Sequence, residues 1–255
     1  MARLGEVPFA RYYGSVDATP LFVMPMGAYY ARTGDLDTVR RLWPNVMAEL
    51  RWIDTSGDPD RDGFVEYHRQ RETGLINQGW KDSVVAIFHA YDELANGPIA
   101  LCEVQGYVFA GKRHAATLAL ALATTAARLE AEAEILRQKF VAVFWCEELP
   151  TYALALDGEK RPCQVIASNA GHALLTVIAA PDRAERVAAT LMGVGCFSGC
   201  RPASASNSII APARSGSTAR DSGSFIEHLH IRGLRLGDAD ADVLFHRFAG
   251  EVAAP

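Results

Sequence analysis

Apolar residues recur at intervals of three and four between positions 36 and 53, and this helical period constrains the fold more than any other feature of the sequence. They are Leu36, Val39, Leu42, Trp43, Val46, Met47, Leu50 and Ile53. Asp35 is placed to cap this helix, and an apolar helix over about residues 19–32 precedes it. Since only Thr33, Gly34 and Asp35 separate the two, we predict an antiparallel helical hairpin, kinked at Pro25.

Two further pairs of helical segments follow. Residues 99–122 and 125–145 form a second long pair, and the second of these carries its acidic residues early and its basic residues late, as the helix dipole favours. Residues 167–180 and 181–192 form a third pair. The order of elements predicts a mainly α protein built from helical hairpins.

Short β elements decorate this helical pattern. Residues 64–69 have the composition of a strand, and residues 151–163 alternate like a small β-hairpin that turns at Asp157 and Gly158. Residues 74–83, GLINQGWKDS, have a composition unsuited to a helix interior, and we expect a loop there.

Three acids in a polar loop imitate the start of a calcium-binding loop. Asp58, Asp60 and Asp62 are followed by Gly63, but Arg69 stands where an EF-hand has its bidentate glutamate. We therefore predict a polar turn rather than an EF-hand, with a looser cation site at the three acids as the alternative.

Composition excludes several classes of partner. The 255 residues carry a net charge of -5, from 25 basic and 30 acidic residues, which predicts no binding to nucleic acid or to an anionic membrane. No apolar run reaches the roughly 18 residues of a membrane span, and no secretory signal is visible, so we expect a cytoplasmic protein without cofactors. The five cysteines, Cys102, Cys146, Cys163, Cys196 and Cys200, are expected to be free thiols.

Three motifs in order resemble those of one enzyme family. RYYGSVDATPLFV at 11–23 is similar to the YN-x-VDAS-LWF stretch in the glucosidase domain of glycogen debranching enzymes. NQGWKDS at 77–83 and GPIALCEVQGYVFAG at 97–111 resemble that family's N-x-x-WMDT and G-x-PVEIQALWY. ASNAGHAL at 167–174 looks like the bacterial amylo-alpha-1,6-glucosidase-like proteins. By this resemblance residues 8–198 are identified as part of a six-hairpin glycosidase domain, the superfamily of trehalase and mannosylglycerate hydrolase.

The resemblance implies a fold and an activity. The fold would be a partial (α/α)6 toroid with short β-hairpin decorations, and the reaction an inverting acid/base hydrolysis of an α-glucosidic bond in a glucoside or oligosaccharide. Asp82 matches the family's general acid, although an aspartate in a loop also commonly caps the following helix. Glu103 and Asp17 match sugar-binding acids. The alternatives are an exposed helix position for Glu103 and a helix cap for Asp17.

Other residues of these motifs are candidates for binding the sugar. Aromatic rings stack on sugar faces, and amides and ammonium groups bond to hydroxyls, although aromatic residues beside apolar runs more often belong to the core. The candidates of this kind are Tyr13, Asn77, Gln78, Trp80, Lys81 and Gln105.

The sequence accounts for only one of the two carboxylates that such hydrolysis needs. In inverting enzymes the two stand about 6.5–9.5 Å apart. The family's base lies near the end of the toroid, and twelve helices of the usual length would need well over ~300 residues. Residues 199–255 depart from the family pattern, and we predict an irregular segment there. The alternative function is an inactive carbohydrate-binding or oligomerisation fragment that self-associates through exposed half-barrel faces.

Overall fold

The computed structural model describes residues 14–70, 74–81, 83–193 and 196, and the backbone of three strands between residues 228 and 253. The chain divides into two units, Met1–Leu191 and Met192–Pro255. The described helices are α1 (Ala18–Thr33), α2 (Leu36–Ile53), a single 3-10 turn η2 (Ala90–Asp92), α3 (Cys102–Ala121), α4 (Ala127–Val143), α5 (Asn169–Leu175) and α6 (Pro181–Met192). The mainly helical architecture follows the sequence prediction.

The α1–α2 hairpin forms for local reasons. Gly34 adopts a positive φ of 66° that favours glycine, and its N–H donates to the Tyr30 carbonyl at 2.8 Å, which ends α1. The Asp35 carboxylate then accepts the Thr38 N–H at 3.0 Å and begins α2, as predicted. Pro25 lies within α1, which continues through it.

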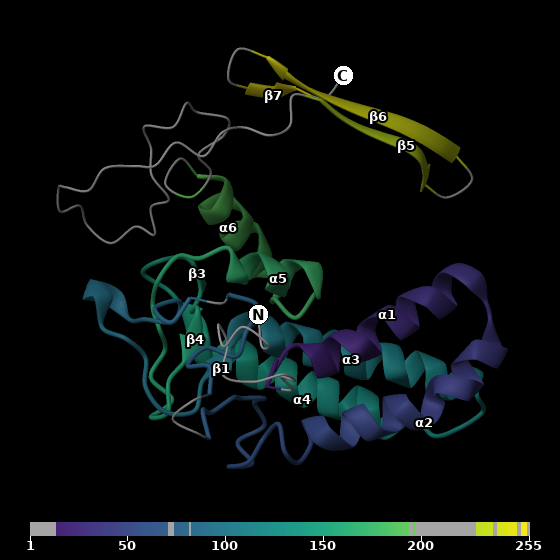
Figure 1. Ribbon diagram of the computed structural model, residues 1–255, viewed down its shortest axis with the longest axis horizontal. Coiled ribbons are helices and arrows are strands. Elements are labelled where there is room, and N and C mark those ends of the chain that lie inside the picture. The colour runs from purple at the N-terminus through teal and green to yellow at the C-terminus, as the bar shows by residue number, and fades with distance from the viewer. Residues whose placement is uncertain are drawn as a thin grey trace, which may run out of the picture. The chain divides into compact units, whose positions relative to one another are not determined.

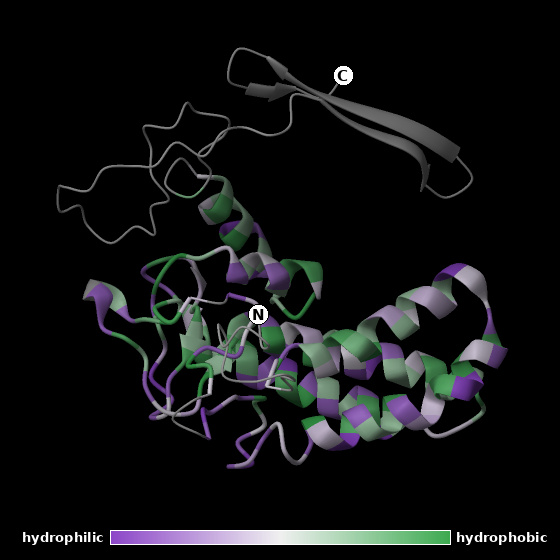
Figure 2. Cartoon of the chain, in the orientation of Figure 1, coloured by the Kyte–Doolittle hydropathy of each residue, from purple (hydrophilic) through white to green (hydrophobic). Residues whose placement is uncertain are grey.

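Helix α3 is the centre of the first unit. It packs against α1, α4 and α5, and nearly every residue over its first three turns is buried. Figure 1 shows the α1–α2 and α3–α4 hairpins side by side, and Figure 2 shows hydrophobic and hydrophilic residues interspersed along these helices. Because the first three turns of α3 are buried on every side, its neighbours must cover all of its faces there.

Four two-residue strands form two pairs, one between segments distant in the sequence and one local. β1 (Ala100–Leu101) pairs with β4 (Ala155–Leu156), and β2 (Trp145–Cys146) pairs with β3 (Thr151–Tyr152), both antiparallel. The predicted hairpin over residues 151–163 is therefore only partly right. Its turn forms, since the Leu154 N–H donates to the Cys163 carbonyl at 3.0 Å, but its strands pair mainly outside it.

An ion cluster joins three helices in the middle of the unit. The Lys112 ammonium, on α3, donates to Asp54 at 2.6 Å beside the end of α2 and to Glu132 of α4 at 2.8 Å. Arg128 donates to the second oxygen of Glu132 at 2.5 Å. The buried cation is thus paired on two sides, which is what burial of a charge requires.

Lys160 completes a second cluster at the acidic loop. Ligand atoms of Asp58, Asp60 and Asp62 lie within 4.8 Å of one another, the spacing of a cation site. The Lys160 ammonium contacts Asp60 at 2.8 Å, Asp62 at 2.7 Å and the buried Glu66 at 2.7 Å. A side-chain cation therefore neutralises this loop, which is the polar turn that the sequence predicts.

The second unit contains strands where we predicted an irregular segment, and that prediction is wrong for the residues of these strands. β5 (His228–Leu236), β6 (Ala239–Phe248) and β7 (Glu251–Ala253) form an antiparallel sheet in that order. The pairing register shifts between Ile231 and Leu234. This shift explains the error, because it moves the apolar residues from odd to even positions and hides the two-residue period.

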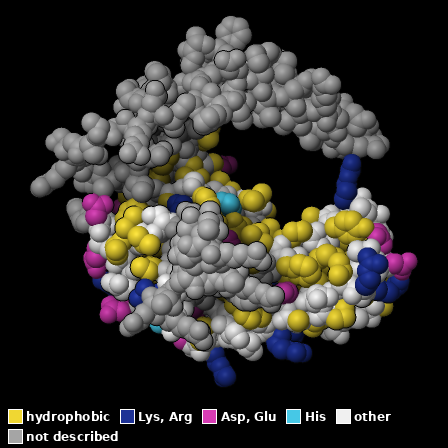
Figure 3. Space-filling view, viewed as in Figure 1, with side chains coloured by type: hydrophobic (Ala, Val, Ile, Leu, Met, Phe, Trp, Pro, Cys, Tyr) yellow, Lys and Arg dark blue, Asp and Glu magenta, His cyan; other side chains and the backbone are white. Residues whose placement is uncertain are grey.

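Some apolar side chains of the first unit lie on its surface. Phe22 and Tyr29 of α1 are exposed, and hydrophobic side chains gather over α1 in Figure 3. Leu175 and Val177, at the end of α5, are also exposed. Self-association through such faces stays a prediction. No described helix is long and apolar enough to cross a membrane.

Candidate functional site

Asn77 shapes the loop that carries the predicted sugar-binding residues. Its carbonyl oxygen accepts the Tyr67 hydroxyl at 2.9 Å and the Gly79 N–H at 3.1 Å. Its amide nitrogen donates to the carbonyls of Lys81 and Ser83. Since Asn77 is buried and its amide is occupied by the loop itself, it positions the loop rather than facing a ligand.

The loop is docked on the starts of two helices. The Val16 N–H, just before α1, donates to the Gln78 carbonyl at 3.0 Å. Gly79 lies so close to Leu101, just before α3, that a Cβ there would stand 2.5 Å from a Leu101 methyl carbon. The Gln78 side chain bonds only weakly, to the Leu75 carbonyl at 3.5 Å. Gln78 therefore contributes its backbone to the arrangement.

Glu103 and Asn169 are two buried polar residues next to this loop. Glu103 lies in the first turn of α3 and is 1% exposed, and Asn169, the first residue of α5, is 0% exposed. One oxygen of the Glu103 carboxyl and both polar atoms of the Asn169 side chain have no hydrogen-bond partner among the described residues. Burial raises the pKa of Glu103, while nearby Asn169 acts in the opposite direction.

Trp80 and Lys81 adjoin Glu103 from the loop. Both lower the pKa of Glu103, Lys81 through its charge and Trp80 through its indole N–H. The Lys81 ammonium lies 5.5 Å from the centre of the Trp80 ring. Trp80 is 51% exposed, so an apolar ring face is open beside a buried carboxyl, and this combination suits a sugar.

Tyr107 and His172 line the same end. The Tyr107 hydroxyl and His172 Nδ1 are 2.8 Å apart, and the His172 ring lies 6.2 Å from the Trp80 ring. Burial raises the pKa of Tyr107 to about 12, and the negative charges of Glu103 and Asp17 add to this effect. These electrostatic effects place Asp17 near the same group of side chains.

Asp17 is a buried acid at the start of α1. It occupies the N-cap position, but its side chain makes no capping hydrogen bond. Instead, its carboxylate accepts the Ser15 hydroxyl. The capping alternative for Asp17 therefore has no support in the geometry, and a carboxylate free of the helix end is available for other contacts.

The structure unites only some of the predicted site residues. Asp17, Trp80, Lys81 and Glu103 come together, whereas Gln105 faces away. The Gln105 amide accepts the Val65 N–H at 2.9 Å and donates to the carbonyls of Val65 at 2.7 Å and Leu101 at 3.0 Å. The Gln105 side chain thus hydrogen-bonds to the backbone of Val65 as a neighbouring strand would.

Two predicted residues, Asp82 and Tyr13, lie outside the described residues. Three others, Tyr107, Asn169 and His172, belong to the site although the sequence analysis did not select them. The available signal was the spacing of Asn169 and His172, three apart in a helical segment, which puts both on one face.

A second constellation looks catalytic but is not arranged for catalysis. His89 Nε2 lies 3.1 Å from Asp157 Oδ2 and 3.9 Å from Cys163 Sγ. A catalytic triad needs the acid and the nucleophile on different ring nitrogens, and here both approach the same one. Burial also raises the pKa of Cys163 to about 12, so the thiol stays protonated.

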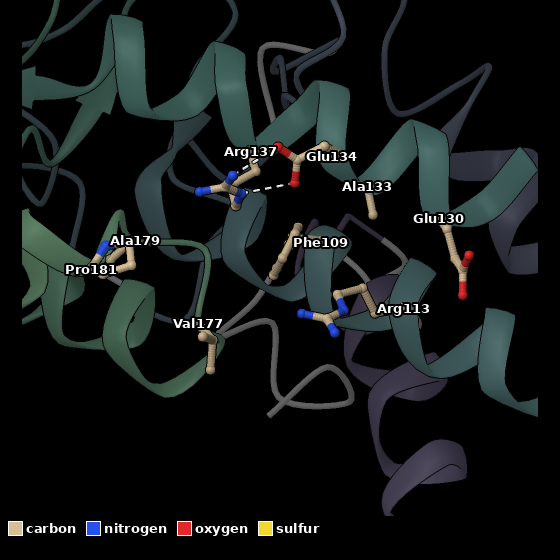
Figure 4. A pocket seen from close by; sticks show the side chains of 9 residues that line it. All are labelled: Phe109, Arg113, Glu130, Ala133, Glu134, Arg137, Val177, Ala179 and Pro181. Carbon is tan, nitrogen blue, oxygen red and sulfur yellow. Dashed lines mark hydrogen bonds and ion pairs between the residues drawn. The ribbon is translucent and has the colours of Figure 1, made fainter. Parts of the chain in front are cut away.

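A groove of about 440 Å³ lies elsewhere, between α3, α4 and the segment that joins α5 to α6. Arg137 donates to both oxygens of Glu134 there, at 2.9 and 2.7 Å, and Arg113 lies over Phe109 (Figure 4). None of the sugar-site residues lines this groove. Its arginine and glutamate satisfy each other, which is typical of a solvated helix surface.

Comparison with known proteins gives a likeness of fold. No family model and no curated protein matches the sequence. The GH63 mannosylglycerate hydrolase from Thermus thermophilus, in complex with glucose, matches with a TM-score of 0.54 and 17% identity over 72% of this chain and 53% of that chain. An uncharacterized conserved protein from the same organism matches with a TM-score of 0.53 and 18% identity, over 71% of this chain and 54% of that one.

The GH78 family rhamnosidase of Bacillus sp. GL1 matches with a TM-score of 0.52 and 21% identity, over 68% of this chain and 17% of that chain. The chain therefore spans between a sixth and about half of these proteins. At such identities the likeness concerns the fold alone. The helical unit has a distant structural match to glycoside hydrolases of the (α/α)6, or six-hairpin, fold.

Proposed function

We propose that this chain is part of a glycoside hydrolase that cleaves an α-glucosidic bond with inversion. One observation carries the proposal: segments far apart in the sequence bring Asp17, Trp80, Lys81 and Glu103 to one group of side chains. The likeness to six-hairpin glycosidases supports it, as do the three sequence motifs. A glucoside or oligosaccharide is the proposed substrate.

Each residue has a role in this proposal. Asp82 follows Lys81 in the chain and is the proposed general acid, which protonates the leaving glycosidic oxygen. Trp80 presents its exposed ring to the sugar face, and Asp17 and Glu103 bond to hydroxyls. Water attacks from the opposite side of the sugar with the help of a base carboxylate, for which we assign no residue.

A second function, sugar binding without hydrolysis, is favoured by a specific observation. The two described acids of the site, Asp17 and Glu103, are both assigned to sugar hydroxyls, which leaves no assigned base among the described residues. The Asp17 carboxylate already accepts the Ser15 hydroxyl. A chain with these acids alone would hold a sugar but leave the bond intact.

Release of glucose from α-glucosides and limit dextrin by the full chain tests the proposal. We expect Asp82→Asn to abolish release and to keep sugar binding, because the amide cannot donate a proton to the leaving group. Glu103→Gln serves as the matched control, since it should weaken binding and turnover together. Binding without release by the unaltered chain would favour the second function, and the absence of both would refute the two functions.

A further inference from the structure

Unsatisfied polar atoms at the junction of α3 and α5 point to a ligand. The Asn169 side chain makes no hydrogen bond of normal length with a described residue, although it lies close enough to Glu103 to lower the pKa of that carboxyl, and one Glu103 oxygen also lacks a described partner. Both residues are more than nine-tenths buried. Leaving such a buried group unsatisfied costs about 1–3 kcal/mol, so stability alone gives no reason to place two of them together.

The other buried amides nearby are satisfied. Gln105 bonds to the backbone of Val65 and Leu101, and Asn77 bonds within its own loop. The same region therefore pairs its structural amides fully. Asn169 differs from these amides because its side chain has no hydrogen bond of normal length among the described residues. Its side chain lies next to the carboxyl of Glu103, which also has one oxygen without a described partner.

The two residues are held rigidly with respect to each other. Gly106 of α3 lies against Thr176 so closely that a Cβ would stand 2.5 Å from the Thr176 hydroxyl. That hydroxyl donates to the His172 carbonyl at 2.7 Å, and the Tyr107 hydroxyl bonds to the His172 ring. These contacts, at His172 and at Thr176 just after the end of α5, fix α5 on α3, as a preorganised binding pair requires.

We propose that Asn169 and Glu103 together recognise a hydroxyl pair of the bound sugar, with Asn169 setting specificity. A carboxylate accepts hydrogen bonds and an amide both donates and accepts, whereas each sugar hydroxyl does both, so adjacent hydroxyls match the pair. The half-exposed Trp80 adjoins the pair and offers the stacking face. This inference rests on the proposed function, because it names the groups that bind the sugar.

Binding of glucose and its monodeoxy analogues to the full chain, measured by titration calorimetry, tests the inference. The unaltered chain should bind at least one deoxy analogue about tenfold more weakly than glucose. Asn169→Leu should bind glucose about as weakly as that analogue and should no longer discriminate between the two. Its denaturation midpoint should fall little, because the amide has no hydrogen-bond partner of normal length among the described residues and loses only its electrostatic effect on the Glu103 carboxyl.

The possible outcomes distinguish failure of the proposal for Asn169 from failure of the proposed function. A chain that binds no glucose or glucoside would overturn both. Glucose binding with full discrimination retained in Asn169→Leu would overturn the inference alone. Asn169→Ala repeats the test without a bulky side chain, and unfolding of both variants would show that the amide has a structural role and would also overturn the inference.

Discussion

Two buried polar side chains on the same helix, α3, differ in whether the protein supplies their hydrogen-bond partners. Lys112, in the middle of α3, is paired with Asp54 and Glu132. Glu103, in the first turn, keeps one oxygen without a described partner and has a raised pKa. Where a buried charge holds helices together, the fold supplies its partners. Where the fold leaves a buried polar group incomplete beside a half-exposed aromatic ring, a ligand is the expected partner.

The largest expected loss of stability comes from breaking the ion pairs of Lys112. Lys112→Met removes the cation between Asp54 and Glu132 and should lower the free energy of unfolding by about 3 kcal/mol, the lower end for a broken buried pair because both acids are partly exposed. Urea denaturation measures this change. Arg128→Gln is the matched control and should cost under ~1 kcal/mol, since the Arg128 side chain is 59% exposed. Equal losses in the two variants would remove the basis of the comparison.

A slightly smaller effect is expected at Gln105. Gln105→Leu leaves the Val65 N–H and carbonyl without their partners in the core and should destabilise the protein by about 2 kcal/mol. The same change at Asn169 should leave stability nearly unaltered. Denaturation midpoints of the two variants, measured together, sharpen the comparison, and a similar loss at both sites would contradict it.

The helices were predictable because their signals are local. The three- and four-residue period of residues 36–53, with Asp35 before it and Gly34 at the end of the preceding helix, predicts the observed bounds of α2. The pairings of β1 with β4 and of β2 with β3 could not be predicted, because strands of two residues show no alternating pattern of apolar residues. Residues 167–180 yielded only the seven-residue α5, since the helical period does not mark where a short helix stops.

The site was predictable where a motif names its residues, and less so where packing decides. The sequence left Glu103 open between an exposed helix position and a sugar contact, and its burial excludes the first. Asn169 was missed because an asparagine at a helix start is ordinarily a cap. Its role depends on the contact of α5 with α3 at Gly106, which no local pattern encodes.

The pH dependence of stability gives the next prediction. Burial raises the pKa of Glu103 above its ordinary value of 4.5, so the folded state prefers the protonated carboxyl. Its contribution to stability is therefore full below pH 4.5 and is lost as the pH rises through the folded pKa. Glu103→Gln should be at least as stable as the unaltered chain at pH 7, and this advantage should vanish in acid. An advantage that grew in acid would show that the pKa is lowered instead.

A small effect on stability is expected at Trp80, together with a large effect on sugar binding. Trp80→Ala removes a half-exposed ring and its contact with the Lys81 ammonium, and should cost only about 0.5 kcal/mol of unfolding free energy. Trp80→Phe keeps a ring but loses the indole N–H that lowers the pKa of Glu103, so that pKa should rise further. Titration with glucose should then show weak or no binding to Trp80→Ala and intermediate binding to Trp80→Phe. If Trp80→Ala instead lost stability and binding in proportion, the ring would belong to the packed core, and the contrast between the middle and the first turn of α3 would rest on Asn169 and Glu103 alone.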